Sequence, residues 1–278
     1  MMSGLLGIVV CVDYDDLLSV TLPRALRSLS ECIVITDPED EKTKAVCQSQ
    51  PRVQIYETDA FRRDGAVFNK GRAIEECLSL HVKSRDQWVL IFDADIVIPA
   101  QSIPVEFLNG ADRNTLYGAY RRMLTVGVGD FPDKERLWLR LERAGDIEFP
   151  GFFQLFHTTA EPLSAAPFWY DPTFTHAGGG DAYFQSLFEQ KIRLDLDVLH
   201  MGERDRNWFG RVTNRIDGLP VDKQVALERQ TLMTKLRRFQ GWMRGFRPSL
   251  KDRIKIPGVI SSYIWGKSVP PGASHDDQ

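Results

Sequence analysis

An acidic pair follows the most apolar segment of the chain. Asp93 and Asp95 come directly after Trp88–Phe92, in the sequence VLIFDADIVIP. In an open α/β sheet, ligands bind beyond the carboxyl ends of the strands. Two carboxylates placed there repel each other and lose hydration unless a cation joins them. A hard divalent cation such as Mn²⁺ or Mg²⁺, with phosphate oxygens, removes both costs. A turn or capping role for the two acids is the alternative.

A second motif offers positive charge at a helix start. In FNKGRAI, Asn69 is suited to cap a helix, and Lys70 and Arg72 fall in its first turn. Helix N-termini attract phosphate groups, and the two cations add fixed positive charge. Ordinary surface charge on a first helical turn is the alternative for both residues.

Two further motifs carry one chemical group each. Asp181 follows three glycines in AGGGDAYF, and His200 ends the apolar stretch VLH. Glycines let the backbone approach a ligand closely, and a helix N-terminus favours an ionised carboxylate, which suits a general base. His200 is a candidate third metal ligand. The alternatives are a helix cap for Asp181 and a structural role for His200.

Aromatic residues and arginines near these motifs are weaker candidates. Rings before the glycine run could stack on sugars or bases, although core packing is equally open. A basic segment after His200 could close over phosphates as a lid. The residues are Phe168, Trp169 and Tyr170 for stacking, Gln154, Phe156 and Trp208 for lining the same cleft, and Arg204, Arg206 and Arg211 for the lid.

The elements that must position these residues alternate between strand and helix patterns. Short apolar runs predict strands at Gly7–Val12, Cys32–Thr36, Val53–Glu57, Trp88–Phe92, Leu116–Tyr120 and Phe152–Phe156. Helical patterns are predicted at Leu17–Leu29, from Asn69 to His81, at Asp181–Gln190 and at 222–245. This order is typical of an α/β fold with a mostly parallel central sheet flanked by helices.

Composition narrows the class of protein. With 278 residues, 43% of them hydrophobic and 26% charged, the chain can bury a core and is neither disordered nor fibrous. Its longest apolar run, Leu5–Val12, is far shorter than the roughly 20 residues of a membrane helix, and no charged segment precedes it. The cysteines form no C-x-x-C pair, which predicts reduced thiols in a cytoplasmic protein rather than zinc or disulfides. They are Cys11, Cys32, Cys47 and Cys77.

Positive charge is concentrated near the C-terminus. The chain has a net charge of −3, but the segment Lys235–Lys255 holds eight basic residues against the single acid Asp252. Aromatic residues are interleaved with these charges, including Phe239 and Trp242. The segment is either a solvated helix face or a surface for an anionic polymer or membrane.

Taken in chain order, the motifs resemble the GT-A glycosyltransferases. The nearest likeness is to their galactosyltransferase-like branch and to a set of bacterial and phage relatives. The matching stretches are VVCVDYDDLLSVTLPRAL, VITDPED, FNKGRAI, VLIFDADIVIP, GGGDAYF and LHMG, which together run from Val9 to Gly202. The resemblance implies a Rossmann-like GT-A fold and a nucleotide diphosphate sugar, a UDP-sugar, as donor. It also implies Mn²⁺ or Mg²⁺ as cofactor.

The resemblance also implies roles for single residues. Asp95 would ligate the metal directly, Asp93 would contact ribose or the metal through water, and His200 would complete the metal site. Asp181 would be the base that deprotonates the acceptor hydroxyl, which implies inversion at the anomeric carbon. The nucleotide-binding set would comprise Val12, Asp13, Tyr14, Asp37, Asn69, Lys70, Arg72, Asp93 and Gly179.

One departure from the family pattern concerns the acceptor. Galactosyltransferases carry two acids after their Gly-Gly, and the first touches the acceptor sugar, whereas Gly180 occupies that position here. The acceptor contact is therefore not implied. We expect a GT-A domain over residues 1–220, with a nucleotide-sugar half (1–100) and an acceptor half (101–220). A basic helical extension and flexible tail are expected over 221–278.

Other functions remain open at this point. Nucleotidyl transfer also uses paired carboxylates, but it favours a basic glycine-rich loop after the first strand, where this chain has CVDYDD. A non-catalytic sugar or nucleic-acid binding module would depend on Lys235–Lys255. The same segment would suit an acceptor that is a hydroxylated base of phage DNA, a lipid-linked molecule or a glycan.

Overall fold

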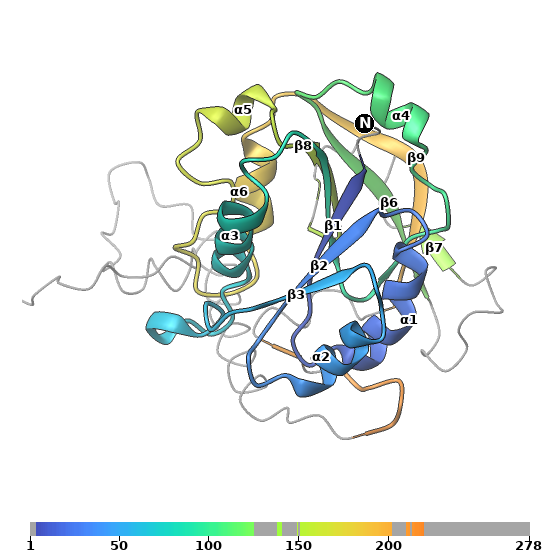
Figure 1. The fold of residues 1–278 in the computed structure, drawn as a ribbon, viewed down its shortest axis with the longest axis vertical. Helices are drawn as coiled ribbons and strands as arrows, with labels where there is room; N and C mark the ends of the chain where they lie inside the picture. The colour runs from blue at the N-terminus through green and yellow to red at the C-terminus, as the bar shows by residue number, and fades with distance from the viewer. Residues whose placement is uncertain are drawn as a thin grey trace, which may run out of the picture.

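A nine-stranded sheet forms the centre of the computed structural model (Figure 1). The structure describes residues 4–123, 149, 151–201, 210–211 and 213–219, and the backbone of 124 and 138–140. The strand order is β3-β2-β1-β4-β8-β6-β9-β5, with β7 paired to β6.

The strands and helices have the following bounds. The strands are β1 (Leu5–Val10), β2 (Glu31–Thr36), β3 (Val53–Glu57), β4 (Trp88–Asp93), β5 (Ile96–Val97), β6 (Leu116–Leu124), β7 (Trp138–Arg140), β8 (Phe153–His157) and β9 (Lys191–His200). The helices are α1 (Asp15–Ala25), α2 (Glu41–Gln48), α3 (Lys70–His81), α4 (Val105–Gly110), α5 (Glu161–Ser164), α6 (Gly180–Ser186) and the 3₁₀ helix η1 (Arg63–Gly65).

The strand directions place most carboxyl ends on one edge of the sheet. The pairs β1/β2, β1/β4, β2/β3 and β6/β9 are parallel, and β4/β8, β6/β8, β6/β7 and β5/β9 are antiparallel. The strands β1, β2, β3, β4, β6 and β9 therefore run in one direction. The prediction of a mostly parallel α/β sheet flanked by helices is confirmed.

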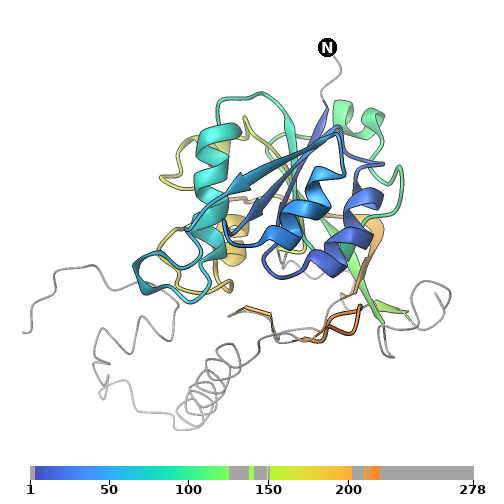
Figure 2. The same ribbon diagram turned by 60° about the horizontal axis from the view of Figure 1, so that its bottom comes forward.

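Helices cover the first half of the sheet on both faces. Along β1, Leu5 and Val9 pack with α1, while Leu6, Ile8 and Val10 pack with α3. Figures 1 and 2 show α1 and α2 on one side of the sheet and α3 and α6 on the other. Burial on both faces explains why these parallel strands have continuously apolar sequences.

The second half of the fold departs from the sequence prediction. The helix predicted at Asp181–Gln190 ends at Ser186, and Lys191–His200 forms the long strand β9. The prediction missed this strand because charged residues occupy every second position in IRLDLD, so only the final apolar residues stood out. The predicted helix at 222–245 and the segment Lys235–Lys255 lie outside the described residues.

The four cysteines are buried as free thiols in the structure. Burial raises the pKa of each of the four thiols, and this disfavours the reactive thiolate. Within the described part of the chain, no helix has both the length and the apolar character needed to cross a membrane.

Candidate active site

The pairing of β5 with β9 brings Asp95 to His200. Asp95 lies in the tight connection between β4 and β5, and Ile96 stands opposite His200 in the β5/β9 register. The main-chain N–H of Met201 donates to the Asp95 carbonyl at 2.9 Å. As a result, His200 Nε2 lies 3.0 Å from Asp95 Oδ2, although the two residues are far apart in the sequence.

This pair is buried but only half satisfied. Asp95 and His200 are each 7% exposed, and neither Asp95 Oδ1 nor His200 Nδ1 has a hydrogen-bond partner among the described residues. Burial would raise the pKa of Asp95, but the charge and hydrogen bond of His200 outweigh it and hold that pKa below its ordinary value. Buried polar atoms without partners are uncommon, so this pair adds little to the stability of the fold.

The donor set fits a divalent cation in part. Two adjacent ligand atoms of an octahedral cation with bonds of about 2.1 Å lie about 3.0 Å apart, which is close to the separation of Asp95 Oδ2 and His200 Nε2. Among the residues that the structure describes, no three His, Cys, Asp or Glu side chains are spaced to hold a metal. The pair therefore offers two protein ligands, and water or substrate phosphate would have to supply the others, as is usual for Mg²⁺.

Lys70 connects two carboxylates of the site. Asn69 caps α3 by accepting a hydrogen bond from the Arg72 N–H at 2.9 Å, so Lys70 begins the helix. Its Nζ donates to Asp93 Oδ1 at 2.5 Å and lies 4.0 Å from Asp181 Oδ1. Burial alone would lower the pKa of Lys70, but the charges of Asp181, Asp93 and Asp95 raise it above its ordinary value. Lys70 is therefore a buried, permanent cation between the acids.

Asp181 lies in the first turn of α6, close to Lys70. Burial raises the pKa of its carboxyl, as does the charge of Asp93, while Lys70 and a backbone hydrogen bond from Gly151 lower it in part. A Cβ at Gly151 would stand only 2.2 Å from Asp181 Oδ2, so only glycine fits there. A carboxylate with a raised pKa is a stronger base than an exposed aspartate, and this suits proton abstraction.

Glycines bring the two helix N-termini together. A Cβ at Gly180 would lie 3.4 Å from the Gly71 Cα, and one at Gly71 would lie 3.1 Å from the Asp171 carbonyl oxygen. Gly179 has φ +105, a left-handed conformation that glycine adopts without strain, and its Cβ would overlap the Phe174 ring. The glycine run thus serves helix packing and a sharp turn, and through them it brings Asp181 to Lys70.

The predicted nucleotide-binding residues lie in three separate settings. Val12, Asp13 and Tyr14 form the loop after β1. Asp37 follows β2, and its Oδ2 accepts a hydrogen bond from Arg62 at 2.9 Å. Arg72 points away from the acidic pair, because its guanidinium is bound to Asp64 at 2.9 Å. Of the predicted site, the structure brings together Asp95, His200, Asp93, Lys70 and Asp181, whereas Arg72 is engaged elsewhere.

The aromatic candidates are mostly core residues. Tyr170 is fully buried, stacks on Phe184 and donates its hydroxyl hydrogen to Gln154 Oε1. Trp169 is 5% exposed and packs edge-on against the fully buried Phe156. The stacking role is therefore wrong for Trp169 and Tyr170, and the lining role is wrong for Gln154 and Phe156. Phe168 is exposed, and Trp208 lies outside the described residues.

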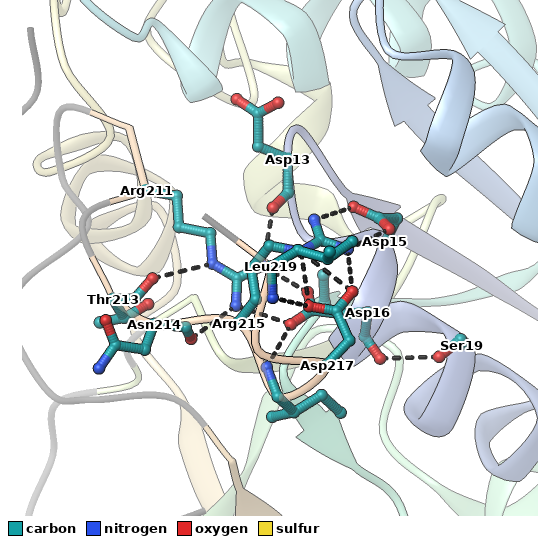
Figure 3. Close-up of polar contacts among 12 residues, drawn as sticks. Asp13, Asp15, Asp16, Ser19, Arg211, Thr213, Asn214, Arg215, Asp217 and Leu219 are labelled. Atoms are coloured by element: carbon teal, nitrogen blue, oxygen red, sulfur yellow. Dashed lines mark hydrogen bonds and ion pairs between the residues drawn. The ribbon is translucent and has the colours of Figure 1, made fainter. Parts of the chain in front are cut away.

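The lid interpretation of Arg211 is also corrected. Arg211 is buried, and both terminal nitrogens of its guanidinium donate to the Asp16 carboxylate (Figure 3). It is therefore not an exposed arginine that could close over a bound phosphate. Arg215 binds Asp15 in the same manner, with both contacts at 2.6 Å. Sequence reasoning missed these partners, because nothing local links α1 to residues some 200 positions later. Arg204 and Arg206 lie outside the described residues.

Comparisons with known proteins add little to this geometry. No family model and no curated protein matches the chain. A solved glucosyl-3-phosphoglycerate synthase from Mycobacterium tuberculosis, in complex with Mn²⁺, UDP and phosphoglyceric acid, is 14% identical over 72% of this chain and 72% of its own, with a TM-score of 0.43. A 4-diphosphocytidyl-2C-methyl-D-erythritol synthase from Anaerococcus prevotii DSM 20548 is 11% identical over 81% of this chain and 95% of its own, also at 0.43.

A third structure, of a mycobacterial protein, is 17% identical over 85% of this chain and 74% of its own, with a TM-score of 0.44. At these identities and TM-scores the likenesses assign neither an activity nor a ligand to this chain. They also do not bear on the galactosyltransferase-like branch or the phage relatives.

Proposed function

We propose that this protein is a GT-A glycosyltransferase that moves a sugar from a nucleotide diphosphate sugar, a UDP-sugar, to an acceptor hydroxyl. The observation that carries the proposal is the buried Asp95–His200 pair, whose Oδ2 and Nε2 atoms lie 3.0 Å apart, as two adjacent ligand atoms of one cation would. It lies on the same sheet edge as the Lys70 cation and the Asp181 carboxylate. A cation-binding pair, a fixed positive charge and a base are the groups that this reaction needs.

Asp95 and His200 would hold Mn²⁺ or Mg²⁺, with Asp93 contributing through water or by contact with ribose. When bound, such a cation supplies positive charge next to a diphosphate leaving group. Lys70 would stabilise the same negative charge, because its ammonium is already buried and needs no rearrangement to act. This fixed charge would balance the acids that surround the donor.

Asp181 would take the proton from the acceptor hydroxyl as that oxygen attacks the anomeric carbon. The raised pKa of Asp181 makes it a better base than an exposed aspartate. A base on the face opposite the leaving group gives inversion of configuration. The acceptor class stays a prediction, because Lys235–Lys255 lies outside the described residues.

The first test is donor turnover. The full chain is incubated with Mn²⁺ and a panel of UDP-sugars, and release of UDP is measured with water alone and with simple hydroxyl acceptors. We expect one donor to be consumed faster than the others, only with Mn²⁺ or Mg²⁺ present, and not by Asp95→Ala. The matched control is Asp86→Ala, since Asp86 is an exposed carboxylate at the opposite end of β4, paired with Arg113 at 3.3 Å.

Two results would contradict the proposal. The first is that no UDP-sugar is bound or consumed under any metal condition while the protein is folded. The second is that Asp95→Ala turns over the donor as fast as Asp86→Ala. Release of pyrophosphate from a nucleoside triphosphate panel would instead indicate nucleotidyl transfer.

A further inference from the structure

The loop after β1 contains a residue in a costly conformation. Asp13 has φ +64, in the left-handed region that non-glycine residues seldom occupy. Such strain persists only where the surroundings enforce it, and it is often found next to functional sites. Both peptide groups of Asp13 are held here. Its N–H donates to Asp40 Oδ2 at 2.8 Å, and its carbonyl accepts from Arg211 Nη1 at 2.8 Å.

Arg211 is built to hold this position. Its guanidinium also binds the Asp16 carboxylate and donates to the carbonyls of Thr213 and Asn214, so each of its three nitrogens has a partner (Figure 3). The same group lies over the Tyr14 ring, with Cζ 4.7 Å from the ring centroid. One buried side chain therefore fixes the backbone at Asp13 and covers one face of the next residue.

Tyr14 links this contact to the candidate site. Tyr14 is half-buried and lies close enough to Asp95 and Asp93 for their charges to act on it, and desolvation together with these charges raises the pKa of the phenol. Arg211 occupies one face of the ring, and Tyr14 also packs against the buried cluster of Leu17, Val97 and Met201. The conformation of the loop Val12–Tyr14 thus depends on Arg211, which lies near the end of the described chain.

We propose that Arg211 is a positioning residue for donor binding, which holds the strained loop Val12–Tyr14 in the conformation that receives the nucleotide. The inference rests on the proposed function, which makes a nucleotide diphosphate sugar the donor, and on the prediction from the sequence that Val12, Asp13 and Tyr14 bind its nucleotide. We call residues 210–211 and 213–219 the C-terminal strap. Because Arg211 belongs to this strap, the position of the strap is coupled to nucleotide binding. Coupling of this kind is reciprocal, so bound nucleotide should also stabilise the strap.

The strap supplies its own matched control. Arg215 also makes a buried ion pair to α1, with Asp15, and a second ion pair with the more exposed Asp217. Figure 3 shows its guanidinium beside these two carboxylates, and its hydrogen bonds in the described chain go to Asp15 and Asp217 rather than to Asp13. Arg211 and Arg215 thus both fasten the strap, but only Arg211 reaches the loop.

The experiment measures the affinity for UDP in the presence of Mn²⁺ by calorimetry, for wild type, Arg211→Met, Arg211→Lys and Arg215→Met. Removing the support of a strained residue should weaken UDP binding by about tenfold in Arg211→Met. Arg211→Lys keeps the charge opposite Asp16 but lacks the planar fork, so it should also bind UDP more weakly, by less. Arg215→Met should bind within about twofold of wild type. Its unfolding temperature should nevertheless fall as far as that of Arg211→Met.

A second measurement follows hydrogen exchange at Ile216, whose N–H donates to Asp16 Oδ2 at 2.8 Å. Adding UDP and Mn²⁺ should slow this exchange in wild type and leave it unchanged in Arg211→Lys. Equal UDP affinity in wild type and Arg211→Lys, or equal losses in Arg211→Met and Arg215→Met, would overturn the positioning role. If wild type itself binds no UDP, the proposed function has failed rather than this inference.

Discussion

Two sets of buried ion pairs in this molecule differ in how completely they are satisfied. In the strap, Arg211 and Arg215 bind Asp16 and Asp15 with their forked donors. Arg211 Nε donates to the Thr213 carbonyl, and Arg215 Nε donates to the Asp217 carboxylate, so every nitrogen of both guanidinium groups has a partner. At the sheet edge, Asp95 and His200 meet through one contact, and each keeps a buried atom without a partner in the described chain.

This difference distinguishes ion pairs that hold the fold in place from a pair that could bind a ligand. A fully paired buried network fixes the position of a segment, and loss of one partner leaves an uncompensated charge. A half-paired site is a poor way to stabilise a fold, because its unpartnered atoms have lost hydration without gaining a bond. We therefore assign the strap to positioning and the edge to ligand binding, and the following predictions test that assignment.

The largest expected effect is on catalysis at the edge. Asp181→Asn should lower kcat for sugar transfer by roughly 10²- to 10⁴-fold, because the amide cannot accept the acceptor's proton. Affinity for UDP should stay near that of wild type, since the base contacts the acceptor. Steady-state kinetics with the preferred UDP-sugar checks this, with Asp86→Asn as control. Unchanged kcat in Asp181→Asn would remove Asp181 as the base.

The second-largest expected effect is on the free energy of unfolding, when the same Asp→Asn substitution is made in the strap and at the sheet edge. Asp16→Asn should lower the free energy of unfolding by about 3 kcal/mol, because it leaves the Arg211 charge buried without a counter-ion. Asp95→Asn should change it by less than about 1 kcal/mol in metal-free protein, because the amide can still bond to His200. Urea unfolding of both variants measures the two values. Equal losses would mean that Asp95 is structural, and the contrast between the regions would be wrong.

The pH dependence of transfer is a smaller effect that also belongs to the edge. Asp181 must be ionised to act, and burial with the charge of Asp93 raises its pKa. The rate should therefore be constant above that pKa and fall as pH is lowered through it, at a higher pH than for an ordinary aspartate. Lys70→Met removes a charge that lowers the pKa, so the falling limb should move to higher pH. A pH–rate profile of kcat in both proteins would show it, and a shift to lower pH would contradict the assignment.

The smallest expected effect is the loss, at low pH, of the stability that the Asp15–Arg215 ion pair of the strap contributes. Hydrogen bonds from Arg215 lower the pKa of Asp15 in the folded protein, against the effect of burial. Its stabilisation is thus complete above the unfolded pKa of about 3.9 and is lost as pH falls through the lower folded value. Denaturant unfolding of wild type and Arg215→Met below pH 5 checks this. The difference between the two proteins should shrink with falling pH, and a widening difference would be incompatible with the pairing.

The parallel half of the fold could be predicted well because its signals are local. Trp88–Asp93 is almost wholly apolar, and Asn69 both looks like and acts as a helix cap. The strand β9 was harder to predict, because charged residues alternate with apolar ones along it and leave no continuous apolar run. The acids and His200 could be singled out as a site because each follows an apolar run. The link between them needs the β5/β9 pairing, which depends on tertiary structure.

The residues that hold the candidate site in place could not be predicted from the sequence. Gly151 is an ordinary glycine in the sequence, and its role appears only because the Asp181 carboxylate occupies the space of its missing Cβ. Likewise, Asp15 and Asp16 stand out as acids in CVDYDD, but their partners follow some 200 residues later. Long-range ion pairs leave no local pattern, so even a correct list of candidate groups omits what holds them.

The most direct test of the central claim is a titration of UDP into the protein with and without Mn²⁺, for wild type, Asp95→Asn and His200→Ala. The account predicts that wild type binds UDP tightly only with Mn²⁺ and that both variants lose this metal-dependent gain while remaining folded. If UDP bound equally well without metal, or if both variants kept the gain, Asp95 and His200 would not form the cation site on which the proposed function rests.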